Sequence, residues 1–257
     1  MPRMTPAVVR TLDILELFLK GPGTLSTADV IRETGVPRST AHELLTTLTT
    51  RGYLRKDEAT GRYSLGVTLL HLGTAYSERF DLLGAANLAA RALSDRLRET
   101  ASVAILQGTS VFYLAKVERR AALAIPSGIG QRLPASCTAI GKMLLSAVPD
   151  EVLVTMYPDP DALPVMTERS IATLPGLLAE SAAIRSRGYA TEQGESTPGL
   201  RCVAALVRDV DGNAAAAIST SVPELRWEKR NEQWWADQVR ESAAELSAQL
   251  GYRAAES

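Results

Sequence analysis

Residues 26–48 have the sequence STADVIRETGVPRSTAHELLTTL, and this stretch decides the fold of the N-terminal part of the chain. Ser26 suits the N-cap of a short helix that runs to Thr34, and Gly35 suits the left-handed position at its end. After a tight turn at 35–37, a second helix is expected from Arg38 to about Arg51, with apolar residues on one side and polar residues on the other. Two helices joined by a glycine-containing turn of this length predict a helix-turn-helix.

The flanking segments complete a winged helix-turn-helix. Apolar residues at spacings of three and four predict a helix over 7–19, which ends before Gly21-Pro22-Gly23. After Gly52 the pattern changes to a period of two over 53–56 and 62–65, with turn residues between these two runs. This change predicts a β-hairpin, which forms the wing.

The outward side of the second helix of the pair is rich in short hydroxyl side chains. Such side chains approach a DNA backbone and base edges closely, whereas a merely solvated helix face usually carries long Glu and Lys pairs. Wing cations are placed to meet phosphates. The predicted DNA contacts are Arg38, Ser39, Thr40, His42, Glu43 and Thr46 on the helix and Arg55, Lys56 and Arg62 on the wing. A protein-interaction module is the alternative for this domain.

Three segments of this domain resemble the IclR family of regulators. They are residues 35–48, residues 51–54 and the opening run at 9–16. The resemblance implies binding to double-stranded DNA. Glu43 departs from the family pattern, which often has Arg there, and a carboxylate could accept a hydrogen bond from a cytosine amino group instead. The operator preference of the family is therefore not transferred to this chain.

The rest of the chain predicts a linker helix followed by an α+β domain. A connecting helix is expected over 66–81, with His71 as a packing or surface residue on it. Strands in mostly hairpin order, flanked by helices, predict a central antiparallel sheet. The expected helices are 82–100, 138–147, 150–156, 174–187 and 224–250, and the expected strands are 102–107, 111–117, 121–125, 189–192, 201–207 and 214–221.

Composition and motifs argue against an enzyme. The chain is 46% hydrophobic and 22% charged, which suits an ordinary soluble protein with two cores, and its net charge of −1 does not by itself indicate nucleic acid. Cys137 and Cys202 would need a nearby imidazole for catalysis, yet His42 and His71 are the only histidines, and both precede the α+β domain. We therefore predict no catalytic residues, no cofactor and no metal site. Without a signal peptide or an apolar span, no membrane association and a cytoplasmic location are expected.

Segments of the second domain also resemble IclR proteins, at 133–142, 194–205, 217–221 and 250–252. The resemblance implies a GAF-like effector-binding domain and assembly as a dimer or tetramer. It also implies a pocket between the start of the 138–147 helix and the sheet. The implied lining is Ala139, Ile140, Gly141, Glu192, Cys202, Ser219 and Ser221, with Ile125, Leu133 and Leu200 as the apolar wall.

This pocket makes physical sense, because amides at a helix N-terminus receive a carboxylate and Ser219 and Ser221 project to one face of a strand. In the alternative interpretation, these serines satisfy backbone groups and Cys202 is a small core residue. Glu192-Gln193 replaces the Asp pair common in the family, and Ala135-Ser136 replaces a bulkier pair. The smaller lining predicts a roomier pocket, so we favour an aromatic carboxylate or a derivative over a two- or three-carbon acid.

The predicted organisation has three parts: a DNA-binding domain at 1–65, a linker helix at 66–81 and an effector domain at 82–257. A homo-oligomer is expected, because a two-fold pair of winged domains doubles the base contacts across an inverted repeat. Leu69, Leu72 and Tyr76 of the linker are the candidate interface. The predicted function is a transcriptional regulator whose operator binding responds to a small organic effector. Two alternatives are a metabolite-sensing module that acts through protein contacts and a cysteine-based enzyme.

Overall fold

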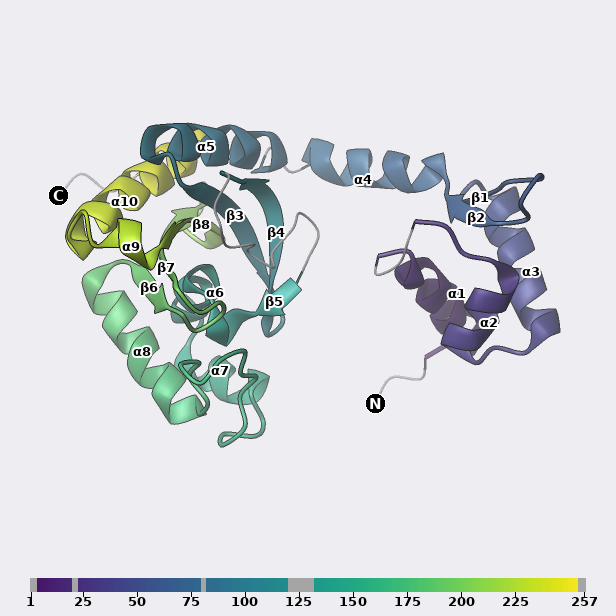
Figure 1. The fold of residues 1–257 in the computed structure, drawn as a ribbon, viewed down its shortest axis with the longest axis horizontal. Helices are drawn as coiled ribbons and strands as arrows, with labels where there is room; N and C mark the ends of the chain where they lie inside the picture. The colour runs from purple at the N-terminus through teal and green to yellow at the C-terminus, as the bar shows by residue number, and fades with distance from the viewer. Residues whose placement is uncertain (1–3, 20–22, 80–81, 120–131, 254–257) are drawn as a thin grey trace. The chain divides into compact units, whose positions relative to one another are not determined.

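The structure is a computed structural model, and it describes residues 4–19, 23–79, 82–119 and 132–253. The chain divides into two units, Met1–Phe80 and Asp81–Ser257. Each unit has its own hydrophobic core, and Figure 1 shows the elements of both. None of the helices in the described part is long and apolar enough to cross a bilayer.

The first unit is a winged helix-turn-helix, as the sequence predicts. Its elements are α1 (Pro6–Leu17), α2 (Thr27–Thr34), α3 (Arg38–Thr50), β1 (Leu54–Lys56), β2 (Tyr63–Leu65) and α4 (Val67–Arg79). Strands β1 and β2 form the antiparallel wing. The core combines residues from α1, α2, α3 and the wing, including Ile14, Val30, Leu45 and Leu54.

Local interactions fix both ends of α2. The Ser26 hydroxyl accepts a hydrogen bond from the Asp29 backbone N–H at 3.1 Å, and the Asp29 carboxylate accepts one from the Ser26 N–H at 2.9 Å. This reciprocal pair is a capping box. Gly35 ends α2 with φ of 66°, a conformation that glycine adopts at little cost. The caps set where α2 starts and stops, and α3 starts after Pro37.

The buried side of α1 differs from the apolar stripe in the sequence. Val8 and Leu12 belong to the expected stripe, but they are 55% and 51% exposed. Ile14 and Phe18 supply the buried contacts of α1 instead. The face of α1 that is buried therefore differs from the predicted face, and apolar side chains of the predicted face remain at the surface.

The second unit is an α+β domain built on one antiparallel sheet. Its helices are α5 (Leu82–Leu97), η1 (Ala135–Cys137), α6 (Ala139–Ser146), α7 (Asp150–Met156), α8 (Leu174–Arg187), α9 (Glu224–Trp227) and α10 (Glu232–Gln249). Its strands are β3 (Thr100–Gln107), β4 (Ser110–Val117), β5 (Arg132–Pro134), β6 (Ala190–Gln193), β7 (Leu200–Arg208) and β8 (Ala214–Pro223). The strand order is β5-β4-β3-β8-β7-β6, and every neighbouring pair is antiparallel.

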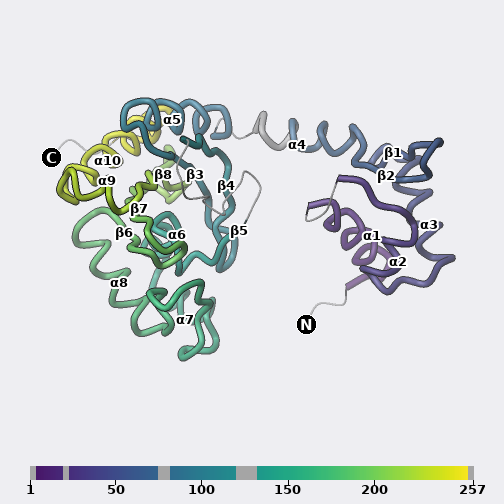
Figure 2. The backbone as a smooth tube through the Cα atoms, in the orientation of Figure 1, coloured from purple at the N-terminus to yellow at the C-terminus, as the bar shows by residue number. Residues whose placement is uncertain are grey.

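Helices cover both faces of this sheet. Helices α5 and α10 pack on one face, where apolar residues from both helices form one core cluster with the strands. Helices α6 and α8 pack on the other face in a second cluster. Figure 2 traces the backbone through these two helical layers on either side of the sheet. The domain is thus a sheet between helices, and α6 lies directly against the strands that carry the predicted pocket residues.

Two elements differ from the predictions. The short edge strand β5 lies in a segment for which no strand is predicted. The single helix expected over 224–250 is two helices, because Asn231 caps α10 by accepting a hydrogen bond from the Trp234 N–H at 2.8 Å. The strand expected over 121–125 and the pocket residue Ile125 lie outside the described residues.

Candidate nucleic-acid interface and ligand pocket

Helix α3 presents a polar face to solvent. Its apolar side, with Ala41, Leu45 and Leu48, is buried in the core of the first unit. The predicted DNA-contacting residues lie on the other side: Arg38, Ser39, His42, Glu43 and Thr46 are exposed and Thr40 is half-buried. No side chain caps the N-terminus of α3. Its first amides are therefore free of side-chain acceptors and can receive a phosphate.

The three wing cations have different surroundings. Arg55 and Lys56 are exposed on β1, and the Lys56 ammonium lies 3.9 Å from a Glu58 carboxylate oxygen. Arg62 instead donates to the Thr24 carbonyl at 2.9 Å and to the Thr24 hydroxyl at 3.1 Å. It also lies 3.4 Å from Asp29. The Arg62 guanidinium therefore holds the wing against the start of α2, and a DNA contact from it stays a prediction.

Asp29 is central to this arrangement. Hydrogen bonds from the Ser26 backbone and hydroxyl lower the pKa of Asp29 to about 2, and Arg32 contributes further. The carboxylate therefore stays ionised over the whole working range of pH. It can cap α2 and receive Arg62 at the same time.

A small cavity lies between the start of α6 and the sheet of the second unit. Its volume is ≈ 20 Å³. Of the predicted lining residues that the structure describes, all take part except Gly141. The lining consists of Ser102, Tyr113, Leu133, Thr138, Ala139, Ile140, Glu192, Ser196, Thr197, Leu200, Cys202, Ser219 and Ser221. A cavity of this size holds about one water molecule, so the roomier pocket expected from Ala135-Ser136 is not what the structure shows.

Polar side chains form a row across three strands at this cavity. In the sheet register Glu192 of β6 lies opposite Cys202 of β7, and Cys202 lies opposite Ser221 of β8. The Cys202 thiol donates to the Ser221 hydroxyl at 3.2 Å. Burial raises the pKa of Cys202 well above its ordinary value, and Glu192 adds to the shift. The thiol is therefore a neutral hydrogen-bond donor and not an activated nucleophile.

Ser219 lies two residues before Ser221 on β8, so both side chains project to the same face of the sheet. Ser219 lies opposite Ser102 of β3 in the register. Ser102 is buried and also lines the cavity. The sequence did not single out Ser102, because only the pairing of β3 with β8 places it here.

Glu192 has the most unusual environment in the cavity. It is fully buried, and one carboxyl oxygen accepts a hydrogen bond from the Ser196 N–H at 2.8 Å. The other oxygen, Oε2, has no hydrogen-bond partner among the described residues, and neither has the Thr197 hydroxyl. Burial raises the pKa of Glu192, although the Ser196 N–H partly opposes the shift. Buried polar groups of this kind are normally satisfied, so two unpartnered ones point to a ligand or water.

The N-terminus of α6 contributes fewer free amides than expected. The Gly141 N–H donates to the Thr138 hydroxyl at 2.9 Å, which leaves Ala139 and Ile140 as the first-turn residues that line the cavity. Gly141 has a packing role, since a Cβ there would lie 2.1 Å from the Ala135 carbonyl oxygen. Glycine is thus needed for the close approach of α6 to the preceding turn.

A buried ion pair joins α6 to the segment after β6, next to the cavity. The Lys142 ammonium donates to the Glu195 carboxylate at 2.6 Å and lies 3.8 Å from Glu180. Arg187 in turn donates to Glu180 at 2.7 Å. Burial raises the pKa of Glu195, and Lys142 opposes this shift. Lys142 belongs to the segment 133–142 that resembles the family, but no feature of the sequence indicates a cation in the core.

The structure offers little to a catalytic interpretation of the cysteines. Cys137 is buried and donates to the Pro164 carbonyl at 3.1 Å, while both histidines belong to the first unit. Among the described residues, no group of three or more His, Cys, Asp and Glu side chains could hold a metal ion.

These features define a class of protein. The first unit is a winged helix-turn-helix whose exposed polar face carries short side chains. The same chain has an α+β domain with a small polar cavity. This is the organisation of a two-domain DNA-binding regulator. Comparison with known proteins then places the chain within that class. Residues 7–58 match the IclR helix-turn-helix domain, and residues 74–248 match the C-terminal domain of bacterial IclR transcriptional regulators. The chain belongs to the IclR family and is a DNA-binding transcriptional regulator.

Individual relatives agree with this assignment. The chain is 34% identical to the HTH-type transcriptional regulator BhcR of Paracoccus denitrificans over 94% of this chain and 86% of the relative. The Thermotoga maritima IclR structure is similar to this chain with a TM-score of 0.75 at 26% identity. The alignment covers 95% of this chain and 98% of the Thermotoga chain. An IclR homologue from Microbacterium hydrocarbonoxydans, solved with 4-hydroxybenzoate, has the same fold, with a TM-score of 0.85 at 23% identity over 95% and 98% of the two chains. The curated relatives bear names of regulators, which agrees with the prediction that the chain is not an enzyme.

Proposed function

We propose that the cavity at the start of α6 is an effector site and that a small organic acid bound there changes the affinity of the winged domain for its operator. The observation that carries this proposal is the unpartnered Glu192 Oε2 in a cavity whose other polar side chains are neutral. Residues 1–65 then serve as the DNA-binding domain, 66–81 as the linker and 82–257 as the effector domain. A regulator of this kind works where the DNA is, which supports a cytoplasmic location.

The lining favours an acid that also carries a hydrogen-bond donor. Ser219, Ser221 and the amides of Ala139 and Ile140 offer neutral donors for a carboxylate, as a helix N-terminus commonly does. Glu192 Oε2 suits a hydroxyl or N–H of the same molecule. An ionised Glu192 would repel a carboxylate, but its raised pKa favours the neutral form, which reduces this repulsion. In the neutral form Oε2 carries the proton, because Oε1 accepts from Ser196, and Oε2 then donates to the ligand instead.

We propose an aromatic hydroxy acid as the first class to test, with a two- or three-carbon acid as the competing class. The aromatic class requires the cavity to open, because a ring the size of benzene needs about 150 Å³ and the cavity measures ≈ 20 Å³. The structural neighbour solved with 4-hydroxybenzoate supports the aromatic class only through its shared fold.

Isothermal titration with 4-hydroxybenzoate, benzoate and lactate tests this proposal. Ser219→Ala, Ser221→Ala and Glu192→Gln are compared with Ser186→Ala, a control on the exposed side of α8. Losing one buried hydrogen bond weakens binding by about tenfold, so each serine variant loses affinity while the control keeps it. Glu192→Gln changes the preference between 4-hydroxybenzoate and benzoate. Unchanged affinity in all three pocket variants would place the ligand elsewhere, and selective binding of lactate would favour the small-acid class.

We further propose that the winged domain binds an inverted repeat as part of a homodimer or tetramer. Leu72 of α4 is 53% exposed, and Leu70 of the same helix is 67% exposed, which leaves apolar surface for a second copy. Leu69 is half-buried, and the side chain of Tyr76 lies outside the described part. Light scattering of the parent and of Leu72→Asp tests the interface. A monomeric parent that still binds DNA would contradict it.

Replacement of the two exposed wing cations tests the mode of DNA binding. Each lost phosphate contact lowers the salt slope by about one. The Arg55→Ala, Lys56→Ala double variant is therefore expected to bind more weakly and with a shallower salt dependence in a mobility-shift titration. Parent-like affinity and slope would remove the wing from the interface. Absence of any DNA binding by the parent would favour the alternative of a sensing module that acts through protein contacts.

A further inference from the structure

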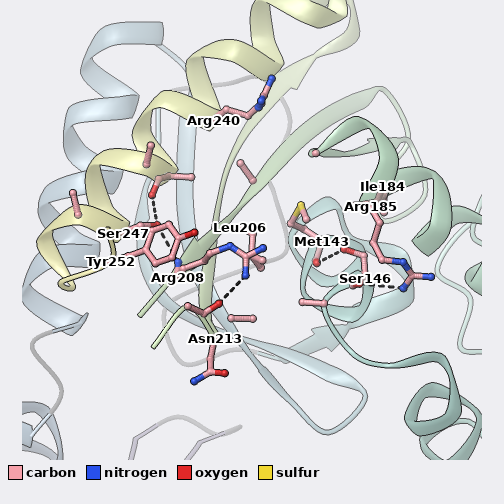
Figure 3. A pocket seen from close by; sticks show the side chains of 18 residues that line it. Met143, Ser146, Ile184, Arg185, Leu206, Arg208, Asn213, Arg240, Ser247 and Tyr252 are labelled. Carbon is pink, nitrogen blue, oxygen red and sulfur yellow. Dashed lines mark hydrogen bonds between the residues drawn. The ribbon is translucent and has the colours of Figure 1, made fainter. Parts of the chain in front are cut away.

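A second and much larger depression lies in the effector domain, away from the cavity at the start of α6. It is an open groove of ≈ 770 Å³, bounded by the end of α6, by α8 and α10 and by the turn between β7 and β8. Figure 3 shows the side chains that line it. A volume of this size lies in the range of sites for small organic ligands.

The groove is cationic. Arg185 of α8, Arg208 of β7 and Arg240 of α10 line it, and no Asp or Glu is among its lining residues in the described part of the chain. Three guanidinium groups from three different elements thus share one depression. Such an arrangement attracts anions, and guanidinium geometry suits carboxylate and phosphate in particular.

Two of these arginines keep donors for a ligand. Arg208 donates through Nη1 to the Gly212 carbonyl at 2.7 Å, a single bond that fixes the side chain at the turn and uses one of its five N–H groups. Arg240 is half exposed, and its nearest carboxylate is Asp237 at 3.8 Å. Arg185 is more engaged, because it donates to the Ser146 carbonyl at 3.2 Å and to Asp150 at 3.0 Å.

Between the arginines the wall of the groove is apolar. The half-buried Leu206 and the exposed Ala147 and Ala244 contribute to it, and Tyr252 stands on the α10 side beside Arg208 (Figure 3). An inorganic ion would use only the cationic part of this surface. A ligand with both an apolar body and an acidic group would use all of it.

The groove is separate from the cavity at the start of α6 although the two share elements. Helix α6 starts at the cavity with Ala139 and Ile140 and ends at the groove with Ser146. At 1.5 Å per residue, this separates the two ends by about 10 Å along the helix axis. Strands β7 and β8 also carry residues of both sites.

We propose that this groove is a second ligand site, which binds a small organic anion made of an apolar body and a carboxylate or phosphate group. Figure 3 draws the side chains of Arg208 and Arg240 apart, so one of them holds the anionic group and the apolar wall beside it receives the body. The site is independent of the effector cavity, so it does not rest on the function proposed for that cavity.

Isothermal titration of the full chain tests the site with isophthalate and phenyl phosphate, and acetate and inorganic phosphate serve as probes that lack the apolar body. The variants are Arg240→Glu and Arg208→Gln, whose amide can still donate to the Gly212 carbonyl. Arg91→Glu, an exposed position on α5, is the matched control for the change of charge. Ser219→Ala reports on the effector cavity.

The expected result is binding of isophthalate or phenyl phosphate that Arg240→Glu or Arg208→Gln weakens by about tenfold or more, and the more sensitive position identifies the arginine that holds the acidic group. Unchanged binding in both variants would overturn the proposal. Arg91→Glu and Ser219→Ala leave this binding unchanged, and acetate and inorganic phosphate bind more weakly than the probes with a ring. The better of the two ring probes identifies the preferred acidic group. Absence of binding by both ring probes at millimolar concentration would overturn the proposal. An equal loss in Arg91→Glu, or a loss only in Ser219→Ala, would overturn it too.

Discussion

The Lys142 ammonium donates to the Glu195 carboxylate at 2.6 Å, with the lysine side chain only 3% exposed. This ion pair ties α6, whose first residues line the effector cavity, to the segment after β6 that carries Ser196 and Thr197. A buried charge is costly unless it is paired, so each partner requires the other. The pair therefore holds two walls of the cavity together.

Removal of one partner of this pair is expected to destabilise the protein. Lys142→Met leaves Glu195 buried without its cation, and the free energy of unfolding at neutral pH falls by about 3 kcal/mol. The double variant Lys142→Met, Glu195→Gln leaves neither position of the pair charged and recovers most of this loss. Urea unfolding of the parent and both variants measures the effect. A double variant no more stable than Lys142→Met would show that packing, and not charge, sets the cost.

A methyl group at Gly141 is expected to separate α6 from the preceding turn. The new Cβ would lie 2.1 Å from the Ala135 carbonyl oxygen, a backbone atom that cannot move alone. Gly141→Ala therefore lowers the free energy of unfolding by at least about 1 to 3 kcal/mol. Gly84→Ala is the control, because Gly84 lies in α5 with nothing within 4 Å of the added Cβ. This control is expected to be neutral or stabilising, and equal losses in both variants would contradict the role of the close approach.

Glu192 is expected to make stability depend on pH in the direction opposite to that of most carboxylates. Its pKa is raised by burial in the folded protein. Between the ordinary value, about 4.3, and the raised value, the folded protein holds a proton that the unfolded chain has released. The free energy of unfolding contributed by this group therefore falls as the pH rises through that window.

Glu192→Gln removes this contribution, because an amide does not titrate. The melting temperature of the variant relative to the parent is thus expected to increase from pH 4.5 to pH 8. Glu195, whose pKa is also raised, is present in both proteins, so the effect of its own burial cancels in the comparison, whereas the part of its shift that Glu192 causes is lost together with Glu192. Differential scanning calorimetry at several pH values measures the difference. A constant difference across the range would mean that Glu192 titrates like an exposed glutamate.

Local signals explain why much of the first unit could be predicted from the sequence. The Ser26 cap and the left-handed Gly35 act over a few residues, and both are found where the sequence places them. The buried side of α1 could not be predicted in the same way. Its stripe of apolar residues is real, but packing against α2 and α3 selects Ile14 and Phe18 over Val8 and Leu12.

The effector cavity, too, could be predicted from the sequence only in part. The resemblance to a family named Glu192, Cys202 and the two serines of β8. The sheet register brings Glu192, Cys202 and Ser221 into one row, and Ser219 lies two residues before Ser221 on the same strand. Ser102 comes from β3, more than a hundred residues away from Ser219, and only the pairing of β3 with β8 reveals it. The small volume of the cavity could not be predicted either, since it depends on how closely α6 approaches the sheet.

The two arginines of the wing are expected to respond differently to replacement by alanine. Arg62 holds the wing to the start of α2 through Thr24 and Asp29, whereas Arg55 is exposed on β1. Arg62→Ala therefore lowers the thermal stability of the first unit, and it weakens DNA binding by loosening the wing. Arg55→Ala leaves the stability unchanged and reduces the salt slope of DNA binding by about one.

Thermal melts of the two variants, combined with mobility-shift titrations at several salt concentrations, separate these effects. A third variant, Arg62→Lys, keeps the positive charge but loses the planar guanidinium group. If Arg62→Lys binds DNA like the parent and yet is as unstable as Arg62→Ala, the positive charge of Arg62 contributes to DNA binding directly. Its contacts with Thr24 and Asp29 then do not position the wing.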